Sequence, residues 1–139
     1  MLILDTDHLS ALARDDRVTS ALRRKLQAAG SAVGTTAVSV EEVMRGWLAK
    51  IAAERKVVEQ VRYYAKFQSS VTELGRIPIL PFDGKAAEQF ESLRSLRLGV
   101  GTMDLKIASI CLVHGVPLLS RNLRDFERVP GLMVEDWLD

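Results

Sequence analysis

Acidic side chains in this sequence stand close to the predicted ends of secondary-structure elements. Asp5 directly follows a short apolar run that reads as a buried strand, and Asp125 lies in the segment after another such run. In a parallel sheet the carboxyl ends of strands meet at one edge, where ligands bind. Glu42 and Asp104 each stand in the first turn of a predicted helix that borders this edge. The four carboxylates can therefore converge, and together they would suit a cation that prefers oxygen ligands.

The composition limits which metal chemistry is possible. One cysteine, Cys111, and two histidines cannot form an internal disulfide or a conventional structural zinc site. Any metal must therefore be held by oxygen. The net charge is only +1, but setting the four carboxylates aside leaves 19 basic against 14 acidic residues elsewhere. That excess suits an anionic binding partner.

Short runs of apolar or β-branched residues predict the strands that position these carboxylates. The expected strands are 2–4, 32–38, 77–80 and 117–120, with 132–134 as a possible fifth. Helical segments lie between them, and strands that alternate with helices imply right-handed crossovers. The sequence therefore predicts an α/β fold with three layers, in which a mainly parallel sheet of four to five strands has helices on both faces.

Capping residues predict where the helices begin and end. The expected N-caps are Thr6 or Asp7, Ser39, Asp83 and Thr102, and the expected stops are Gly30 and Gly115. Ser39 and Glu42 have the spacing of a capping box. Helical periodicity predicts helices over 8–13 and 17–29, and one long amphipathic helix over 51–74.

Four motifs, in this order and at these spacings, resemble a PIN domain of the VapC type, the toxin half of bacterial VapBC pairs. They are Leu4-Asp5-Thr6-Asp7, Glu42-Val43-Met44-Arg45-Gly46, Gly101-Thr102-Met103-Asp104-Leu105-Lys106-Ile107-Ala108 and Ser120-Arg121-Asn122-Leu123-Arg124-Asp125-Phe126. The resemblance spans nearly the whole chain and implies a single PIN domain over residues 1–139. It also implies an endoribonuclease toxin that uses Mg²⁺ or Mn²⁺, with RNA as substrate, a cognate antitoxin as partner and a tendency to form homodimers.

The resemblance also implies roles for individual acidic residues. Asp5, Glu42 and Asp104 match the three acidic residues with which such nucleases bind metal, and we expect Asp5 and Asp104 to be direct metal ligands. A fourth acidic residue often stands where this chain has Asn122, and Asp125 follows three residues later. Either one can complete the site, and we favour Asp125 because only it can carry charge.

Four further residues are candidates for the surroundings of the metal or for substrate contacts. Ser120 occupies a position where Thr or Ser is frequent, and it can hydrogen-bond a carboxylate or the attacking water. Asp7 is near enough to Asp5 to touch the metal shell, and Asn122 is the alternative fourth member. Arg45 is one helical turn from Glu42, which makes it the best candidate for an RNA phosphate contact.

Simpler roles exist for each acidic residue taken alone. Asp is common at helix starts, which is enough to explain Asp5 or Asp104, and Glu42 can be a capping-box partner. Only the joint pattern favours catalysis. The alternative is a non-catalytic PIN-like protein that binds nucleic acid or a partner protein. The sequence shows no secretory signal and no apolar stretch approaching about 20 residues, so we expect a cytoplasmic protein without a membrane segment.

Overall fold

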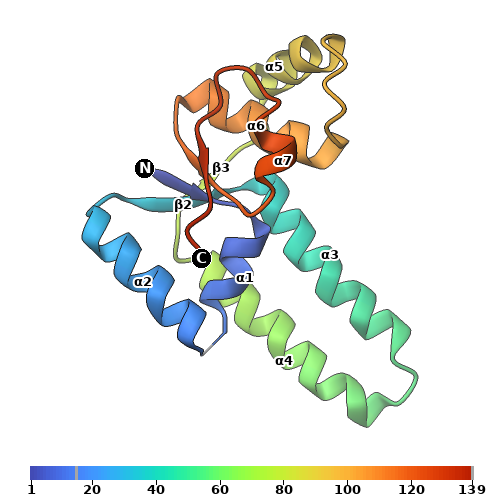
Figure 1. Ribbon diagram of the computed structural model, residues 1–139. Coiled ribbons are helices and arrows are strands. Elements are labelled where there is room, and N and C mark those ends of the chain that lie inside the picture. The colour runs from blue at the N-terminus through green and yellow to red at the C-terminus, as the bar shows by residue number, and fades with distance from the viewer. Residues whose placement is uncertain (15, 139) are drawn as a thin grey trace.

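The structure is a computed structural model, and it describes residues 1–14 and 16–138. In this part of the chain, five strands alternate with helices (Figure 1). The strands are β1 (Leu2–Leu4), β2 (Val33–Thr36), β3 (Ile79–Leu80), β4 (Leu118–Leu119) and β5 (Val134–Glu135). The helices are α1 (Thr6–Leu12), α2 (Arg17–Ala29), α3 (Ala37–Ala53), α4 (Val57–Leu74), α5 (Gly84–Ser95), α6 (Thr102–His114) and α7 (Leu123–Phe126).

The strands form one parallel sheet in the order β3-β2-β1-β4-β5. This confirms the predicted mainly parallel sheet, including its possible fifth strand. The strand over Leu2–Leu4 has the predicted bounds, whereas the other four are shorter than expected; β2 and β4, for example, end where the chain leaves the sheet at Thr36 and Leu119. The order places β1 and β4 side by side, although more than a hundred residues separate them in the sequence.

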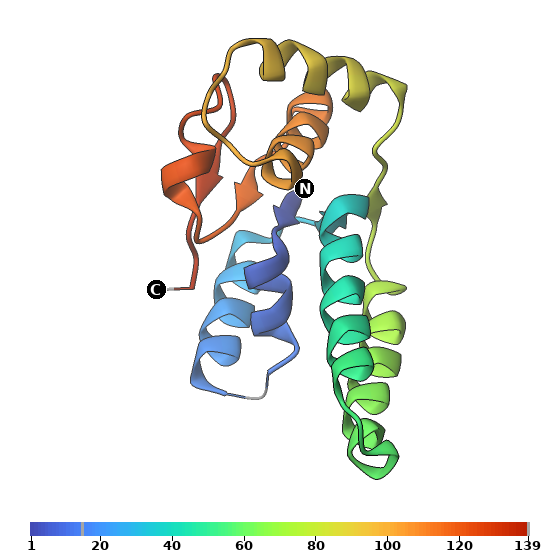
Figure 2. The ribbon, with the colours of Figure 1, turned by 90° about the vertical axis from the view of Figure 1, so that its right-hand side faces the viewer.

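Helices cover both faces of the sheet, which confirms the three-layer α/β arrangement (Figures 1 and 2). Successive side chains of a strand point to opposite faces. Ile3 accordingly packs in one core with residues of α5 and α6, whereas its neighbour Leu4 packs in a second core with residues of α1 and α4. Leu118 and Leu119 divide between the same two cores. The central strands are thus buried on both sides, as parallel sheets require.

Several predicted N-caps are wrong by a few residues. Asp5 itself caps α1, because its Oδ1 accepts the Thr6 N–H at 2.8 Å, so neither Thr6 nor Asp7 does. Thr36 caps α3 through the Ser39 N–H at 3.0 Å, which places Ser39 inside the helix. The predicted capping box of Ser39 and Glu42 is therefore wrong, and Glu42 lies in the second helical turn. Its carboxylate is free for another purpose.

Of the remaining predicted helix ends, one N-cap is wrong, and one N-cap and both glycine stops are confirmed. Gly101, not Thr102, occupies the N-cap of α6, and no side chain there accepts a helix N–H. Asp83 does cap α5, as predicted, by accepting the Ala86 N–H at 3.0 Å. The stops at Gly30 and Gly115 are confirmed, since both adopt the left-handed conformation that glycine tolerates.

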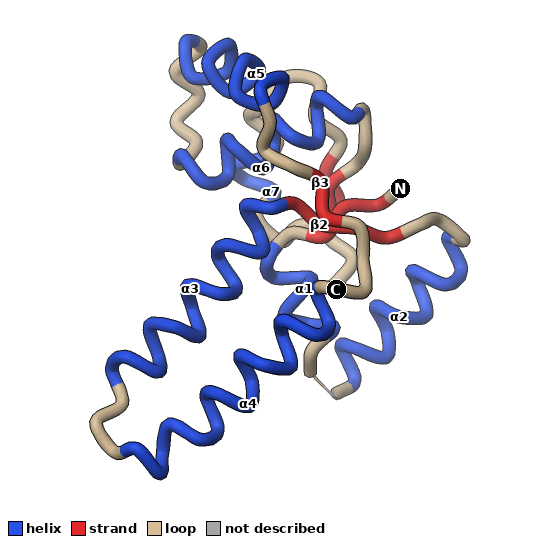
Figure 3. The backbone as a smooth tube through the Cα atoms, turned by 180° about the vertical axis from the view of Figure 1, so that it is seen from behind, coloured by secondary structure: helices blue, strands red, loops and turns tan. Residues whose placement is uncertain are grey.

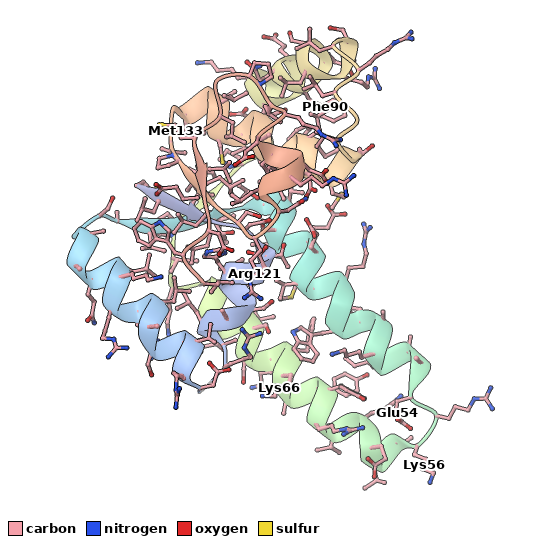
Figure 4. The ribbon with its side chains drawn as sticks, viewed as in Figure 1. Glu54, Lys56, Lys66, Phe90, Arg121 and Met133 are labelled. Atoms are coloured by element: carbon pink, nitrogen blue, oxygen red, sulfur yellow. The ribbon has the colours of Figure 1, made fainter. Side chains whose placement is uncertain are left out.

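The long helix predicted over 51–74 is wrong, because the chain reverses direction between α3 and α4. The turn carries Glu54 and Lys56 at the tip of a hairpin that projects away from the sheet (Figures 3 and 4). Gln60 stabilises this turn by donating from Nε2 to the carbonyl oxygens of Ile51 and Glu54 at 3.0 and 2.9 Å. The last carbonyl groups of a helix have no partner within the helix. By satisfying two of them, the Gln60 side chain stabilises the reversal of the chain. None of the described helices is long and apolar enough to cross a membrane.

Candidate active site

The site begins at the carboxyl ends of two neighbouring strands. Asp5 directly follows β1 and Ser120 directly follows β4, so the parallel pairing of these strands brings the two residues together. The Ser120 Oγ donates to the Asp5 Oδ2 at 2.7 Å. Both side chains are buried. The predicted contact between Ser120 and a carboxylate therefore exists, and it fixes the orientation of Asp5.

Asn122 links the strand ends to α6. Its Nδ2 donates to the Asp104 Oδ2 at 2.8 Å and to the Asp125 Oδ2 at 3.1 Å. Its backbone N–H donates to the Ser120 Oγ at 3.0 Å. Asn122 and Asp125 are thus neighbours in one cluster, and the asparagine amide separates two carboxylates that would otherwise repel each other.

Glu42 reaches the cluster from α3. Its Oε1 is buried and has no hydrogen-bond partner among the described residues. Burial, followed by the charges of Asp5 and Asp104, raises the pKa of Glu42 to about 7. The Thr6 hydroxyl opposes this rise from nearby, without reaching hydrogen-bond geometry. A buried carboxylate oxygen without a donor is costly, and it suits a ligand that brings positive charge.

Burial also raises the pKa of Asp5 and Asp104. The Ser120 hydroxyl and the Thr6 N–H partly offset the rise at Asp5, and Asn122 partly offsets the rise at Asp104. Neighbouring carboxylates push both pKa values further up. The carboxylates of Asp5, Glu42, Asp104 and Asp125 are named the acidic cluster below. Three of the four are held where their own negative charge is unfavourable.

Asp7 and Arg45 lie at the margin of the acidic cluster or outside it. Asp7 accepts the Arg121 N–H at 2.9 Å, and the Ser120 Oγ is 3.4 Å from the same oxygen. Arg45 instead pairs with Glu41 one turn earlier on α3, and 68% of its side chain is exposed. The structure therefore brings Asp7 to the site and leaves Arg45 on the surface beyond it.

His8 is a neighbour of the site that sequence reasoning missed. It is fully buried, and its Nδ1 lies 2.6 Å from the Asp7 Oδ1. The sequence carries a weak signal for it, a histidine directly after Asp5-Thr6-Asp7. Nothing in that spacing shows that its ring is buried.

The donor set fits a hard divalent cation such as Mg²⁺. Carboxylate, amide and hydroxyl oxygens are its preferred ligands, and the unpartnered Glu42 Oε1 adds an open one. Within residues 1–14 and 16–138, no three carboxylate, histidine or cysteine side chains are arranged to hold one ion directly. A cation held by one or two of these carboxylates would keep several waters, as Mg²⁺ commonly does.

Comparison with known proteins identifies the family. The PIN domain family model matches residues 2–132. Ribonuclease VapC1 of Rickettsia felis is 30% identical to the chain over 137 residues, which cover 96% of this chain and 93% of that protein. The tRNA(fMet)-specific endonuclease VapC of Salmonella typhimurium is 37% identical over 68 residues. That second match covers 46% of this chain and spans about half, 52%, of the length of that relative.

Solved structures share the fold. A chain in the DNA-bound VapBC structure from Salmonella typhimurium has a TM-score of 0.73 and 25% identity, with 98% of this chain and 97% of that chain covered. A chain in a toxin–antitoxin complex from Klebsiella pneumoniae has the same fold, with a TM-score of 0.71 and 22% identity. The chain belongs to the PIN-domain family, in its VapC branch.

Proposed function

We propose that this chain is a Mg²⁺-dependent endoribonuclease, with Mn²⁺ as an alternative metal, and that it acts as the toxin of a toxin–antitoxin pair. The observation that carries the proposal is the acidic cluster, in which Glu42 keeps a buried oxygen without a partner beside Asp5 and Asp104. Such an arrangement costs stability unless a cation compensates it. Membership of the VapC branch, whose relatives include named ribonucleases, supports the same activity.

In this proposal Asp5 and Asp104 hold the metal, and Glu42 and Asp125 complete the catalytic set. A bound metal would polarise the phosphate, generate a hydroxide from water and neutralise the departing oxygen. Ser120 orients Asp5 through its hydroxyl, and this contact holds the carboxylate toward the cluster. Glu42 faces the same cluster with a buried carboxylate oxygen that has no hydrogen-bond partner among the described residues, so it can accept a hydrogen bond from a water bound to the metal.

The proposed partners follow from charge and family. RNA is the proposed substrate, because the excess of basic residues outside the acidic cluster favours an anionic chain. Arg45 is the proposed phosphate contact. To bind a phosphate of the RNA, it must first release Glu41, with which it forms an ion pair. A cognate antitoxin is the proposed protein partner, since toxin–antitoxin complexes share the fold. We further propose that the chain is a single PIN domain that forms homodimers and acts in the cytoplasm.

A cleavage assay on purified protein tests the enzymatic part. We expect the chain to cut RNA with millimolar Mg²⁺ or Mn²⁺ and not with EDTA. Asp5→Asn is expected to abolish cleavage, whereas Asp83→Asn, which alters a distant helix cap, is expected to retain it. RNA that stays intact in the presence of both metals would refute the proposed activity.

A growth assay tests the biological part. Expression of the chain alone is expected to slow growth, and expression together with the small protein encoded next to it is expected to restore growth. Asp5→Asn is the matched control, because it removes a proposed metal ligand without changing the fold's core. Normal growth with abundant soluble parent protein would contradict the toxin role.

The alternative is a non-catalytic PIN-like protein that binds nucleic acid or a partner protein. One observation favours it: Asn122 stands where an acidic residue often occurs, and its amide satisfies both Asp104 and Asp125. The alternative predicts RNA binding that is unaffected by EDTA and no cleavage. A binding assay run beside the cleavage assay separates the two functions.

A further inference from the structure

A buried histidine connects two parts of the chain that are distant in sequence. The His8 ring is fully buried on α1, and both of its nitrogens have partners. The Trp137 N–H donates to the Nε2 at 3.1 Å. Because the Nε2 accepts this hydrogen bond, the ring proton must lie on the Nδ1, which faces the Asp7 Oδ1 at 2.6 Å. The geometry therefore selects one tautomer of a neutral imidazole.

Asp7 extends this connection to the loop after β4, residues 120–122. One carboxylate oxygen accepts from His8, and the other accepts the Arg121 N–H at 2.9 Å. Asp7 is thus held through both of its carboxylate oxygens between α1 and the loop. Arg121 is labelled in Figure 4, where the loop passes α1.

The loop in turn positions the acidic cluster. Its Ser120 hydroxyl orients Asp5, and its Asn122 amide holds Asp104 and Asp125. A change in where the loop lies would therefore move three of the four carboxylates relative to one another. Among the polar contacts of Asp7 with other described side chains and with the 120–122 loop, the bond from His8 is the one that does not come from the loop.

The other end of the connection is the C-terminal segment, residues 136–138. It continues from β5, whose Glu135 carbonyl accepts the Ser120 N–H at 2.9 Å. The Trp137 carbonyl also accepts from the Lys25 Nζ at 3.0 Å, so both backbone polar groups of Trp137 are held. Asp136 faces the same ring, with its Oδ1 3.8 Å from the His8 Nε2. Figures 1 and 3 show this end of the chain beside α1.

We propose that His8 is a positioning residue of the nuclease site, which holds Asp7, and through it the 120–122 loop, by donating from its Nδ1, while the Trp137 N–H on its Nε2 fixes this tautomer. The inference rests on the proposed function for its catalytic consequence. His8 touches neither the acidic cluster nor the surface where RNA would bind. Its removal should therefore lower kcat and leave KM unchanged, because substrate contacts stay intact while the carboxylates lose their fixed arrangement.

Two substitutions separate the two halves of the connection. The amide nitrogen of His8→Asn lies near the position of the Nδ1 and keeps the donor to Asp7, but it gives up the acceptor for Trp137. The longer His8→Gln brings its amide oxygen near the Nε2 position, so it keeps the acceptor and gives up the donor. Thr19→Val is the matched control, because it removes a buried hydrogen bond from α2 to the Ala11 carbonyl of α1 without touching Asp7.

The kinetic expectation distinguishes positioning from packing. His8→Gln should lower kcat by about 10-fold, the lower end of the loss typical of residues that orient a metal ligand, because His8 acts on Asp5 and Asp104 only through Asp7 and the loop. His8→Asn should recover most of this loss, and Thr19→Val should lower thermal stability without changing kcat. Equal kcat losses for the two His8 variants, or none for either, would overturn the proposal.

A second measurement needs neither metal nor activity. In metal-free parent protein, nitrogen NMR of the ring should show the proton on the His8 Nδ1, and the Arg121 amide should be protected from hydrogen exchange. His8→Gln should reduce that protection and His8→Asn should preserve it. A proton on the Nε2 of the parent would overturn the proposal even if neither variant folds. If the parent cuts no RNA, the proposed function fails, whereas these spectra still decide whether His8 holds the loop.

Discussion

Glu42→Gln should stabilise the metal-free protein at neutral and alkaline pH. Glu42 has a buried oxygen without a partner, and its pKa is raised to about 7 by burial and by the charges of Asp5 and Asp104. Glutamine has nearly the same shape and carries no charge. The substitution therefore removes an unfavourable interaction while it keeps the packing of α3.

The sign and the size follow from proton linkage. Between pH 4.5 and about 7 folded Glu42 binds more protons than the unfolded chain does, so stability falls as the pH rises through this window. The rise of the Glu42 pKa from 4.5 to about 7 corresponds to a loss of about 3 kcal/mol in the free energy of unfolding, at about 1.4 kcal/mol per pKa unit. Because the side chain is partly exposed, solvent screening reduces the expected gain to about 1–2 kcal/mol. For a chain of this length, that is a Tm increase of about 3–7 °C.

Thermal melts of parent and variant in EDTA, from pH 4.5 to 8.5, measure the effect. The two melting temperatures should coincide at the acid end, where both side chains are neutral, diverge between pH 4.5 and about 7, and stay apart by a constant amount above pH 7. Added Mg²⁺ should narrow the gap by stabilising the parent. Glu41→Gln is the matched control, since Glu41 is exposed beside Arg45 and should give no such divergence. Parallel curves for Glu42→Gln and parent would refute the reasoning.

Three further predictions concern the site and its margin. Asp104→Asn should lower cleavage by at least about 100-fold, a larger loss than the removal of a residue that only orients a metal ligand causes. Its Tm in EDTA should stay that of the parent protein. A less stable variant that still cuts RNA would contradict the site. Arg45→Ala should weaken RNA binding and reduce the salt slope by about one, while Glu41→Ala, which frees the arginine, should strengthen binding; identical affinities for both would place Arg45 outside the RNA contact. Asn122→Ala should lower metal-free stability, because Asp104 and Asp125 then face each other, and Asp125→Ala should lower cleavage if Asp125 completes the site. Normal cleavage by both would indicate a site of three carboxylates.

The sequence was most informative at the first strand, which determines both how the core is divided and where Asp5 lies. Leu2–Leu4 is apolar throughout, which predicts a strand buried on both faces, and the structure places Ile3 and Leu4 in opposite cores. The end of the same run fixes Asp5 at the edge of the sheet. Parallel pairing made it possible that Asp5 meets Ser120, but the contact also needs β1 and β4 to be neighbours, an order that the structure shows and the sequence did not specify.

Helix ends were less predictable because neighbouring residues compete for the same role. Thr36 and Ser39 are both good N-caps, and the start of α3 at Ala37 selects Thr36. The turn between α3 and α4 contains neither glycine nor proline, so periodicity alone continued the helix through it. Gln60 of α4 binds the carbonyl oxygens at the end of α3. This contact requires the two helices to lie side by side, so a local sequence pattern does not predict it.

Asp5 and Asp7 show what a residue type cannot reveal about a site. They are two positions apart and of one type, yet burial and neighbouring charges raise the pKa of the first, while hydrogen bonds from His8 and Arg121 lower that of the second. Asp7 has donors for both of its oxygens and gains little from a cation. Asp5 has donors too, but it shares its surroundings with Glu42 and Asp104, and added positive charge would relieve the repulsion among them. The difference lies in the partners that the fold supplies, and it supports the proposal that Asp5 binds the metal while Asp7 belongs to the frame that holds the site.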